Sequence, residues 1–204
     1  MVHAKRQKRS LVADKRKEIL NSAIEVFAQK GYNNANIVEV AAKAGVASGT
    51  VYLYFKNKDD LLLQAMKTMM DSNLEEIKAK ADLEEKSIDK LFMFFYHHIE
   101  VFAQKPSMAR FLIVELRQSE EFYKLHPSYN PYHDYQDYVQ ELVRNSIKEG
   151  TTKPFKPETI SYLILGVMDT VLTEWLINPD KIDLESVTNE LREIIRFGIR
   201  TNDK

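Results

Sequence analysis

A single glycine between two helical patterns limits what the N-terminal part of this chain can fold into. Upstream of Gly45, apolar residues recur with the spacing of a helix that buries one side: Ile37, Val40, Ala41 and Ala44. Gly45 tolerates the left-handed backbone that ends a helix, and a short second helix is expected up to Phe55. Ala41 lies four residues before the glycine and Val51 six residues after it, which is helix-turn-helix spacing.

A further helix is expected before this motif. A buried stripe predicts it from about Asp14 to Gln29, with Gly31 as its end. Asn36 is the expected N-cap of the next helix. Residues 1–13 contain four closely spaced cations and no apolar period, so we expect a disordered basic arm that could contact phosphates or a minor groove.

Composition and charge exclude several classes of protein. The chain has no cysteine, so disulfides, thiol catalysis and cysteine-based zinc sites are excluded. The N-terminus lacks the apolar run of a signal peptide and the apolar clusters are too short to cross a bilayer, which predicts a cytoplasmic protein without a membrane partner. Residues 1–60 carry eleven Lys/Arg and six Asp/Glu, whereas residues 61–204 carry eighteen and twenty-four. This asymmetry fits a nucleic-acid-binding N-terminal part, although a solvated charged surface would have the same composition.

The remaining chain is expected to be all-α, with about nine helices in total. A long helix from Lys58 to about Lys80 is followed by a strongly apolar helix from Ser87 and another from Pro106. Residues 120–135 are rich in Tyr and Pro, which predicts an irregular connection. Two apolar helices end the chain and predict either a four-helix seam between two copies or the core of one protomer.

The sequence shows no catalytic apparatus. No Gly-rich phosphate loop, nucleophile elbow or paired-carboxylate site is present, so neither an enzyme nor a cofactor is expected. His97, His98 and Glu100 do not place both imidazoles on one helical face, so no metal site is expected.

The motif resembles a known family of DNA-binding proteins. Gly45-Val46, the run Gly49-Thr50-Val51-Tyr52-Leu53-Tyr54-Phe55-Lys56-Asn57-Lys58 and Asp59-Asp60-Leu61 are similar to the signature of the TetR family of bacterial repressors. The resemblance covers residues 15–62. It implies a homodimer with a three-helix DNA-binding domain at 14–57 and an all-helical effector-binding and dimerisation domain at 58–204. Ala47 departs from the capping Ser that is common in the family, so Ser48 or no side chain caps the recognition helix.

The resemblance and the residue chemistry assign roles on the DNA side. Ser48, Gly49 and Tyr52 are expected nearest the base edges, and Val38 is expected to touch a thymine methyl group. The hydroxyl groups of Thr50, Tyr52 and Tyr54 and the ammonium group of Lys58 are suited to hydrogen bonds with phosphate oxygens. A dimer would present two such helices about 34–36 Å apart to an inverted-repeat operator. The expected DNA-binding residues are Asn36, Val38, Ser48, Gly49, Thr50, Tyr52, Tyr54 and Lys58.

The second half resembles, more loosely, the members of the family that regulate fatty-acid degradation. The matching residues are Glu115-Leu116-Arg117-Gln118-Ser119, Gly166 to Asp169, Thr173-Glu174-Trp175 and 179–184. This resemblance implies a long-chain acyl-CoA effector, for which aromatic side chains could wall a tube and cations could bind phosphates. A plain apolar core and a surface of salt bridges would explain the same residues. The expected effector-binding residues are Phe94, Phe95, His98, Phe102, Met108, Arg110, Phe111, Glu115, Arg117 and Tyr123.

Three function classes remain distinguishable from the sequence. The preferred one is a repressor of fatty-acid degradation genes that a long-chain acyl-CoA releases from its operator. A repressor of an efflux pump that responds to lipophilic drug-like compounds is the alternative, and an architectural DNA-binding protein without an effector is a third. The expected dimer-interface residues are Ile164, Val167, Val171, Trp175, Leu191 and Ile195.

Overall fold

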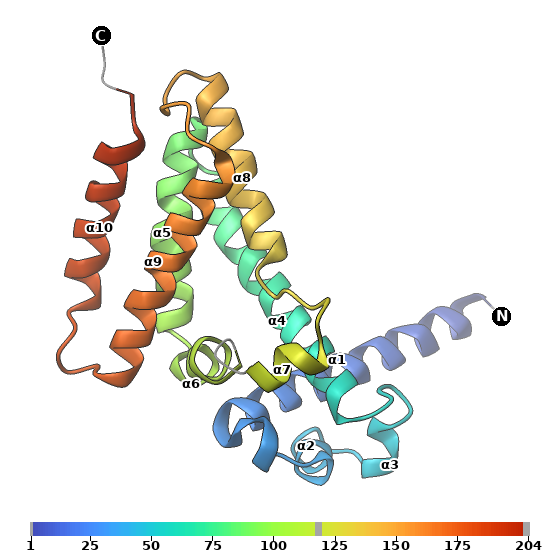
Figure 1. The fold of residues 1–204 in the computed structure, drawn as a ribbon. Helices are drawn as coiled ribbons and strands as arrows, with labels where there is room; N and C mark the ends of the chain where they lie inside the picture. The colour runs from blue at the N-terminus through green and yellow to red at the C-terminus, as the bar shows by residue number, and fades with distance from the viewer. Residues whose placement is uncertain (1, 117–119, 202–204) are drawn as a thin grey trace. The chain divides into compact units, whose positions relative to one another are not determined.

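The expected all-α fold is confirmed. The computed structural model describes residues 2–116 and 120–201, with side chains from Val12 onward except at 115, 116, 121 and 125. These residues form ten α-helices, one π-helix and a single antiparallel bridge between Thr152 and Arg200 (Figure 1). The chain divides into two compact units, Met1–Met69 and Met70–Lys204.

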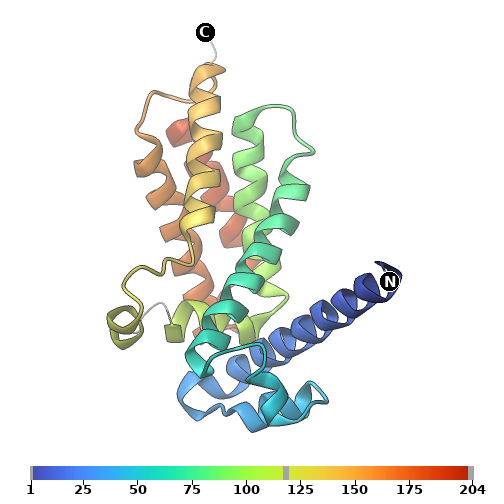
Figure 2. The same cartoon turned by 90° about the vertical axis from the view of Figure 1, so that its right-hand side faces the viewer.

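The first unit contains three helices and the beginning of a fourth (Figure 2). Helix α2 packs against both of its neighbours, α1 and α3. The apolar stripe of α1 lies in the core, where Leu20, Ala23 and Phe27 are fully buried. The elements are α1 (Val2–Asn34), α2 (Ile37–Lys43), α3 (Ser48–Val51) and the start of α4 (Lys58–Ala81).

Local backbone chemistry sets the ends of these helices as the sequence predicts. Gly31 has a φ of 72° and interrupts α1. The side chain of Asn36 caps α2 by accepting a hydrogen bond of 2.9 Å from the Glu39 amide. Gly45 has a φ of 65°, and the following amide of Val46 donates to the Ala41 carbonyl at 2.9 Å. The N-cap position of α3 is Ala47, which provides no side-chain hydrogen bond.

The structure differs from the sequence-based expectation at the N-terminus. Helix α1 begins at Val2, so residues 2–13 are helical instead of forming the expected disordered arm. Helix propensity explains the difference, because the segment is rich in Lys, Arg, Ala, Gln and Leu and contains neither Gly nor Pro.

The first half of α4 belongs to the first unit, whereas the sequence placed the domain boundary at residues 57 and 58. Two hydrogen bonds hold it there: the Tyr32 hydroxyl donates to Asp59, and the Arg16 guanidinium donates to Gln64. The same guanidinium lies 5.5 Å from the centroid of the Phe55 ring, just before α4. The boundary between the compact units falls inside α4, between Met69 and Met70.

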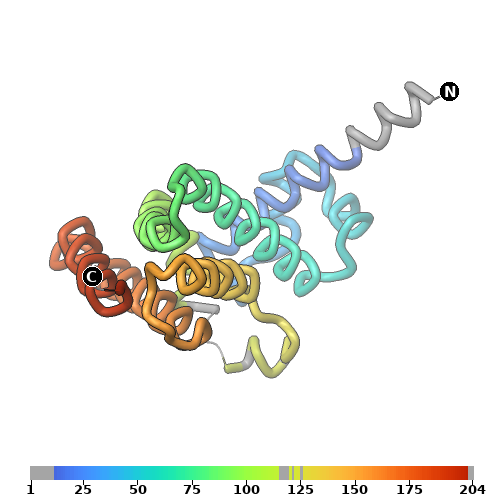
Figure 3. The backbone as a smooth tube through the Cα atoms, turned by 90° about the horizontal axis from the view of Figure 1, so that it is seen from above, coloured from blue at the N-terminus to red at the C-terminus, as the bar shows by residue number. Residues whose placement is uncertain are grey.

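The second unit is a helical bundle. Helices α5, α8 and α9 pack pairwise, and α10 lies along α5 and α9 (Figure 3). Pro106 and Pro157 begin helices, and Gly150 follows the end of α8 with a φ of 74°, as the sequence predicts. The helices are α5 (Ser87–Ala103), α6 (Pro106–Ala109), α7 (Glu120–Leu125), α8 (His133–Lys148), α9 (Pro157–Ile177) and α10 (Leu184–Ile199).

A π-helix, η1 (Arg110–Leu116), follows α6 where the sequence predicts one continuous α-helix. Its residues Phe111, Leu112 and Ile113 are buried, and η1 packs on α9. A π-helix closes its backbone hydrogen bonds between residues i and i+5, so its side chains do not follow the α-helical period of 3.6 residues per turn.

Helix α9 is longer and more apolar than the short apolar runs of the sequence indicate. Eighteen consecutive residues of its 21 have a mean hydropathy of 1.5, which by length and composition alone is enough to cross a bilayer. Half of that stretch is buried, and α9 packs against α5, α8 and α10. This is the pattern of a core helix.

Two glycine substitutions in the helix-turn-helix are expected to change stability in opposite directions. A Cβ at Gly45 or at Gly49 would meet no atom within 4 Å, so backbone conformation alone decides. Gly45→Ala forces a left-handed conformation on alanine and should lower the free energy of unfolding by about 1 kcal/mol. Gly49→Ala lies within α3 and should raise it by roughly 0.5–1 kcal/mol. Urea denaturation at equilibrium measures both, and equal signs would contradict this account.

Candidate functional site

The segment after Gly45 presents a defined outer face. Val51 and Phe55 are buried and anchor α3 and the turn that follows it. The intervening side chains point outward, with Tyr52 55% and Leu53 82% exposed. Val38 on α2 is 64% exposed. Two buried residues four positions apart, with exposed residues between them, give this segment one anchored face and one free face.

The remaining residues expected on this face are accessible to different degrees. Gly49 is exposed, and Ser48, Thr50 and Tyr54 are half-buried. Hydrogen bonds of helical type continue beyond α3, since the amides of Tyr54 and Phe55 both donate to the Val51 carbonyl at 3.0 Å. The backbone from Ser48 to Phe55 is therefore a connected turn of structure that holds these side chains in a fixed order.

Lys58 and Asn36 are both engaged within the first unit. The Lys58 ammonium lies 4.4 Å from the centroid of the Tyr32 ring and 3.4 Å from the Asn33 carbonyl oxygen. Asn36 is exposed, but its side-chain oxygen caps α2. Burial and the neighbouring Asp59 raise the pKa of Tyr32, which keeps that ring neutral beneath the cation. Asn36 lies in the turn between α1 and α2, and the ammonium group of Lys58 lies beside that turn.

Charge separates this face from the rest of the first unit. Residues 40–58 contain three lysines and no Asp or Glu. The nearest upstream carboxylate, Glu39, accepts a hydrogen bond of 2.7 Å from Lys30, and this contact holds the pKa of Glu39 below its ordinary value. Glu25 forms an ion pair of 2.7 Å with Lys43. A surface without unpaired carboxylates suits a polyanion.

Sequence reasoning missed Leu53. Its side chain is the most exposed large apolar group of the first unit's described residues. The signal was available, because Val51 and Phe55 occupy inward positions and residue 53 falls between them on the opposite side. An exposed apolar group beside Tyr52 is suited to contact with a thymine methyl group or a deoxyribose.

The aromatic residues expected to bind an effector form part of the second unit's interior. Phe94, Phe95 and Phe102 are fully buried, as is His98. The His98 ring lies 4.7 Å from Phe102 and 5.5 Å from Tyr135 between ring centroids. Their side chains therefore belong to the core in this structure.

This core also contains polar groups. The Tyr135 hydroxyl donates to the Met70 carbonyl at 3.3 Å, and the Tyr132 hydroxyl donates to Asp169 at 3.4 Å. Lys105 donates to the buried Asn73 at 3.1 Å. Burial raises the pKa of Tyr135, so it remains a neutral donor. A core built for stability alone would avoid the desolvation cost of these groups.

The other expected effector residues lie at the edge of the interior. Phe111 is buried, Met108 and Tyr123 are half-buried, and Arg110 is exposed. The Arg110 guanidinium donates to the Leu176 carbonyl near the end of α9. Arg117 and the side chain of Glu115 lie outside the described part of the chain.

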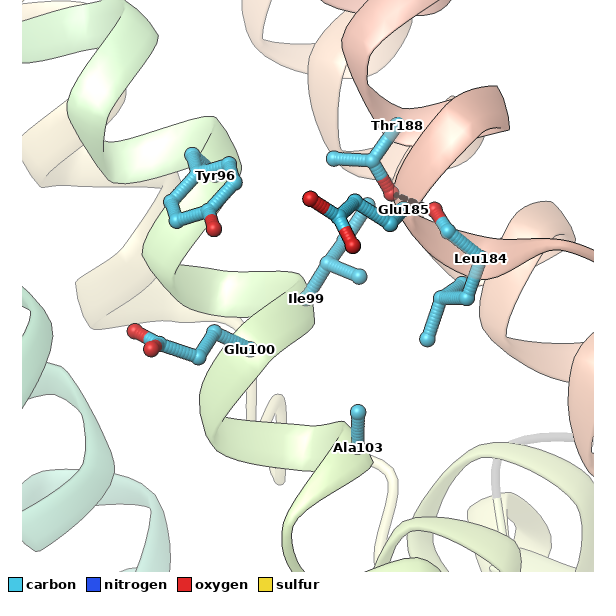
Figure 4. A pocket seen from close by; sticks show the side chains of 7 residues that line it. All are labelled: Tyr96, Ile99, Glu100, Ala103, Leu184, Glu185 and Thr188. Carbon is cyan, nitrogen blue, oxygen red and sulfur yellow. Dashed lines mark hydrogen bonds between the residues drawn. The ribbon is translucent and has the colours of Figure 1, made fainter.

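A pocket lies elsewhere in the second unit, between α5 and α10 (Figure 4). It has a volume of about 270 Å³, and none of the expected effector residues lines it. Its lining residues are Tyr96, Ile99, Glu100, Ala103, Leu184, Glu185 and Thr188. Among the described residues, no group of three or more His, Asp or Glu side chains could hold a metal ion.

The residues expected at a dimer interface divide into two groups. Ile164, Val171 and Ile195 are buried within the protomer, so they belong to its own core. Val167, Trp175 and Leu191 are half-buried. The apolar side chains that α9 and α10 leave exposed are different ones: Tyr162, Leu163, Ile177, Ile194 and Phe197.

Comparison with known proteins places both units in one family. The profile described as bacterial regulatory proteins, tetR family, matches residues 19–65, and the profile described as YsiA-like protein, C-terminal region, matches residues 65–198. The fatty acid metabolism regulator protein of Bacillus subtilis (strain 168) is 32% identical over 188 residues, which cover 89% of this chain and 94% of that protein.

Solved structures agree with the sequence comparison. The regulator FadR of Bacillus subtilis, crystallised in complex with stearoyl-CoA, superimposes with a TM-score of 0.78 at 29% identity, covering 90% of this chain and 98% of that one. The fatty acid degradation regulator FadR of Bacillus halodurans gives a TM-score of 0.76 at 26% identity, over 89% and 94% of the two chains. These relatives are regulators and not enzymes. The chain therefore belongs to the TetR family of bacterial transcriptional regulators and is related to its fatty acid metabolism regulators.

Proposed function

We propose that the protein is a repressor that binds an inverted-repeat operator as a homodimer and leaves it when a long-chain acyl-CoA binds. The regulated genes would be those of fatty-acid degradation, and the protein would act in the cytoplasm. The observation that carries the DNA-binding part is the outward face of α3 and of the turn that follows it, where Tyr52 and Leu53 are exposed on a segment free of carboxylates.

The positions of the side chains in α3 and after it support separate roles in contacting bases and phosphates. Gly49 and Tyr52 lie on the free face, where they would approach the base edges of a major groove. Lys58 lies beside the turn between α1 and α2, where a cation would approach phosphate oxygens. Base contacts give specificity and phosphate contacts give affinity, so the two sets should respond differently to substitution.

An exposed apolar surface supports the homodimer. Ile194 and Phe197 are exposed on α10, where 77% of Phe197 is exposed. Tyr162 and Leu163 are exposed on α9, which packs against α10. Large apolar side chains that neighbouring helices leave exposed are costly to leave in water and are typical of an interface. Two copies related by a twofold axis would each contribute the same surface.

The relative crystallised with stearoyl-CoA supports an acyl-CoA effector. The aromatic core around His98 and Tyr135 supplies apolar walls together with polar groups, as ligand sites do. The α5–α10 pocket does not suit this ligand, because 270 Å³ is smaller than the roughly 300–1,000 Å³ of sites for drug-sized molecules. We therefore place the acyl chain among the aromatic side chains of the core.

Substitutions in α3, in the turn that follows it and at the start of α4 test the DNA-binding face. Tyr52→Ala should change the order in which operator variants are preferred, because it removes a group next to the bases. Lys58→Ala should weaken binding to all variants equally and reduce the slope of log K against log salt by about one. Gly49→Ala should lower operator affinity about tenfold or more despite raising stability. Fluorescence anisotropy over a salt series measures these effects, and equal responses of all three variants would contradict the assignment.

A charge on α10 tests the dimer. Phe197→Glu should weaken the dimer at least about 30-fold, because a buried aromatic anchor contributes roughly 2 kcal/mol or more and a carboxylate cannot replace it. Leu83→Glu is the matched control, since Leu83 is equally apolar and exposed but lies in the turn between α4 and α5. Sedimentation velocity measures the dimer mass. A Phe197→Glu protein that stays dimeric would place the interface elsewhere.

Ligand addition tests the effector. Stearoyl-CoA should lower operator affinity at one fixed salt concentration, whereas CoA alone and a lipophilic cation such as ethidium should not. Mass spectrometry should recover the thioester intact, as expected for a regulator. Release by ethidium alone would favour an efflux-pump repressor instead.

A matched pair of arginines tests where the CoA phosphates bind. Arg110→Gln should weaken binding of stearoyl-CoA about tenfold and leave binding of stearate unchanged, because only the former carries phosphates. Arg144→Gln, on α8, is the control, since its guanidinium contacts Gln140 on the same helix. Isothermal titration measures both ligands. Equal loss for both ligands would assign Arg110 a structural role.

A further inference from the structure

The pocket between α5 and α10 has a chemical character that an acyl-CoA site does not need. Part of its lining is apolar and is formed by Ile99, Ala103 and Leu184. Its remaining lining groups are polar, and they come from both helices (Figure 4). A small apolar body would fit the apolar part if its polar end matched the polar groups.

The two carboxylates of the lining residues differ in availability. Glu100 accepts hydrogen bonds from Lys80 at 2.9 Å and from His97 at 2.7 Å, and these contacts hold its pKa below the ordinary value. Figure 4 shows its carboxylate directed away from α10. Glu100 is therefore ionised, but its charge is already compensated.

Glu185 is the available carboxylate. Figure 4 shows it reaching from α10 into the space between the two helices, towards Tyr96. It forms no ion pair with any cationic side chain among the described residues, and no Lys, Arg or His lines the pocket. The pocket therefore carries a negative charge, and a ligand can reach the carboxylate of Glu185.

The hydrogen-bonding groups around Glu185 mainly accept. The Thr188 hydroxyl donates its proton to the Leu184 carbonyl at 2.5 Å, so it can only accept from a ligand. The carboxylate of Glu185 accepts as well, and the Tyr96 hydroxyl can do so. A matching ligand must bring the donors, and an ammonium group brings three.

We propose that the α5–α10 pocket is a second small-molecule site, which binds an organic ammonium ion with a small apolar body. The ammonium contacts Glu185 and Thr188, and the apolar body lies on Ile99, Ala103 and Leu184. A volume of 270 Å³, equal to that of about nine water molecules, suits a molecule of roughly ten non-hydrogen atoms. Glu185 lies in the first turn of α10, where the helix dipole compensates part of its charge, but it has no cationic side-chain partner among the described residues. It would repel a polyanionic acyl-CoA, so the two ligands would not compete here.

Methyl NMR on the full chain tests the site with two probes of equal size, 2-phenylethylammonium and 2-phenylethanol. The ammonium ion should produce saturable shifts at the methyl groups of Ile99, Ala103, Leu184 and Thr188, with an affinity about tenfold higher than that of the alcohol. The difference arises from the charge-assisted hydrogen bond to Glu185. The absence of shifts at these methyl groups would overturn the proposal.

Two glutamate variants of α10 complete the experiment. Glu185→Gln should reduce the affinity for the ammonium ion to that for the alcohol, because it keeps the shape and removes the charge. Glu190→Gln should leave the preference unchanged, since Glu190 is exposed on the same helix and does not line the pocket. A preference that survives Glu185→Gln would overturn the proposal. The titration uses neither operator DNA nor acyl-CoA, so its result is independent of the proposed repressor function.

Discussion

The outward face of α3 and of the turn that follows it depends on the burial of Val51 and Phe55. An isolated helix of four residues is not stable in water, because the first turn costs more conformational entropy than its hydrogen bonds return. Tertiary packing of these two side chains supplies what the helix lacks. The positive φ at Gly45 directs the chain into this packing, and Tyr52 and Leu53 face outward as a geometric result.

Punctuating residues made most of the helix boundaries predictable. Pro106 and Pro157 begin helices because the missing amide costs nothing there, and Gly31, Gly45 and Gly150 adopt positive φ where a helix ends or breaks. The π-helix over Arg110–Leu116 was not predictable, because its first apolar positions also fit an α-helical stripe. The helical start of α1 was not predicted, because clustered charge favours disorder whereas the helix propensity of the same residues favours a helix.

The residues of the candidate sites were predictable only in part, because helical periodicity does not show which apolar side chains the protomer itself buries. Helix α9 is apolar on most of its circumference, and periodicity does not tell which part the protomer itself covers. Ile164 lies in the core whereas its neighbour Leu163 is exposed, and this depends on where α5 and α8 pack. The aromatic side chains Phe94, Phe95 and Phe102 of α5 are buried, but the sequence alone does not distinguish a core from a ligand-binding wall.

Under the proposed function, α4 is the element through which an effector acts. It is continuous from Lys58 to Ala81, and the boundary between the compact units lies within it. Its start is fixed because Asn57 accepts from the Asp60 amide at 2.8 Å while Asp60 accepts from the Lys56 amide at 2.8 Å. Further along, Tyr135 ties α8 to α4 through the Met70 carbonyl. A coupling of tenfold to a hundredfold requires only about 1.4–2.7 kcal/mol, so an acyl chain that displaces Tyr135 and its packing neighbours would change enough contacts to account for release.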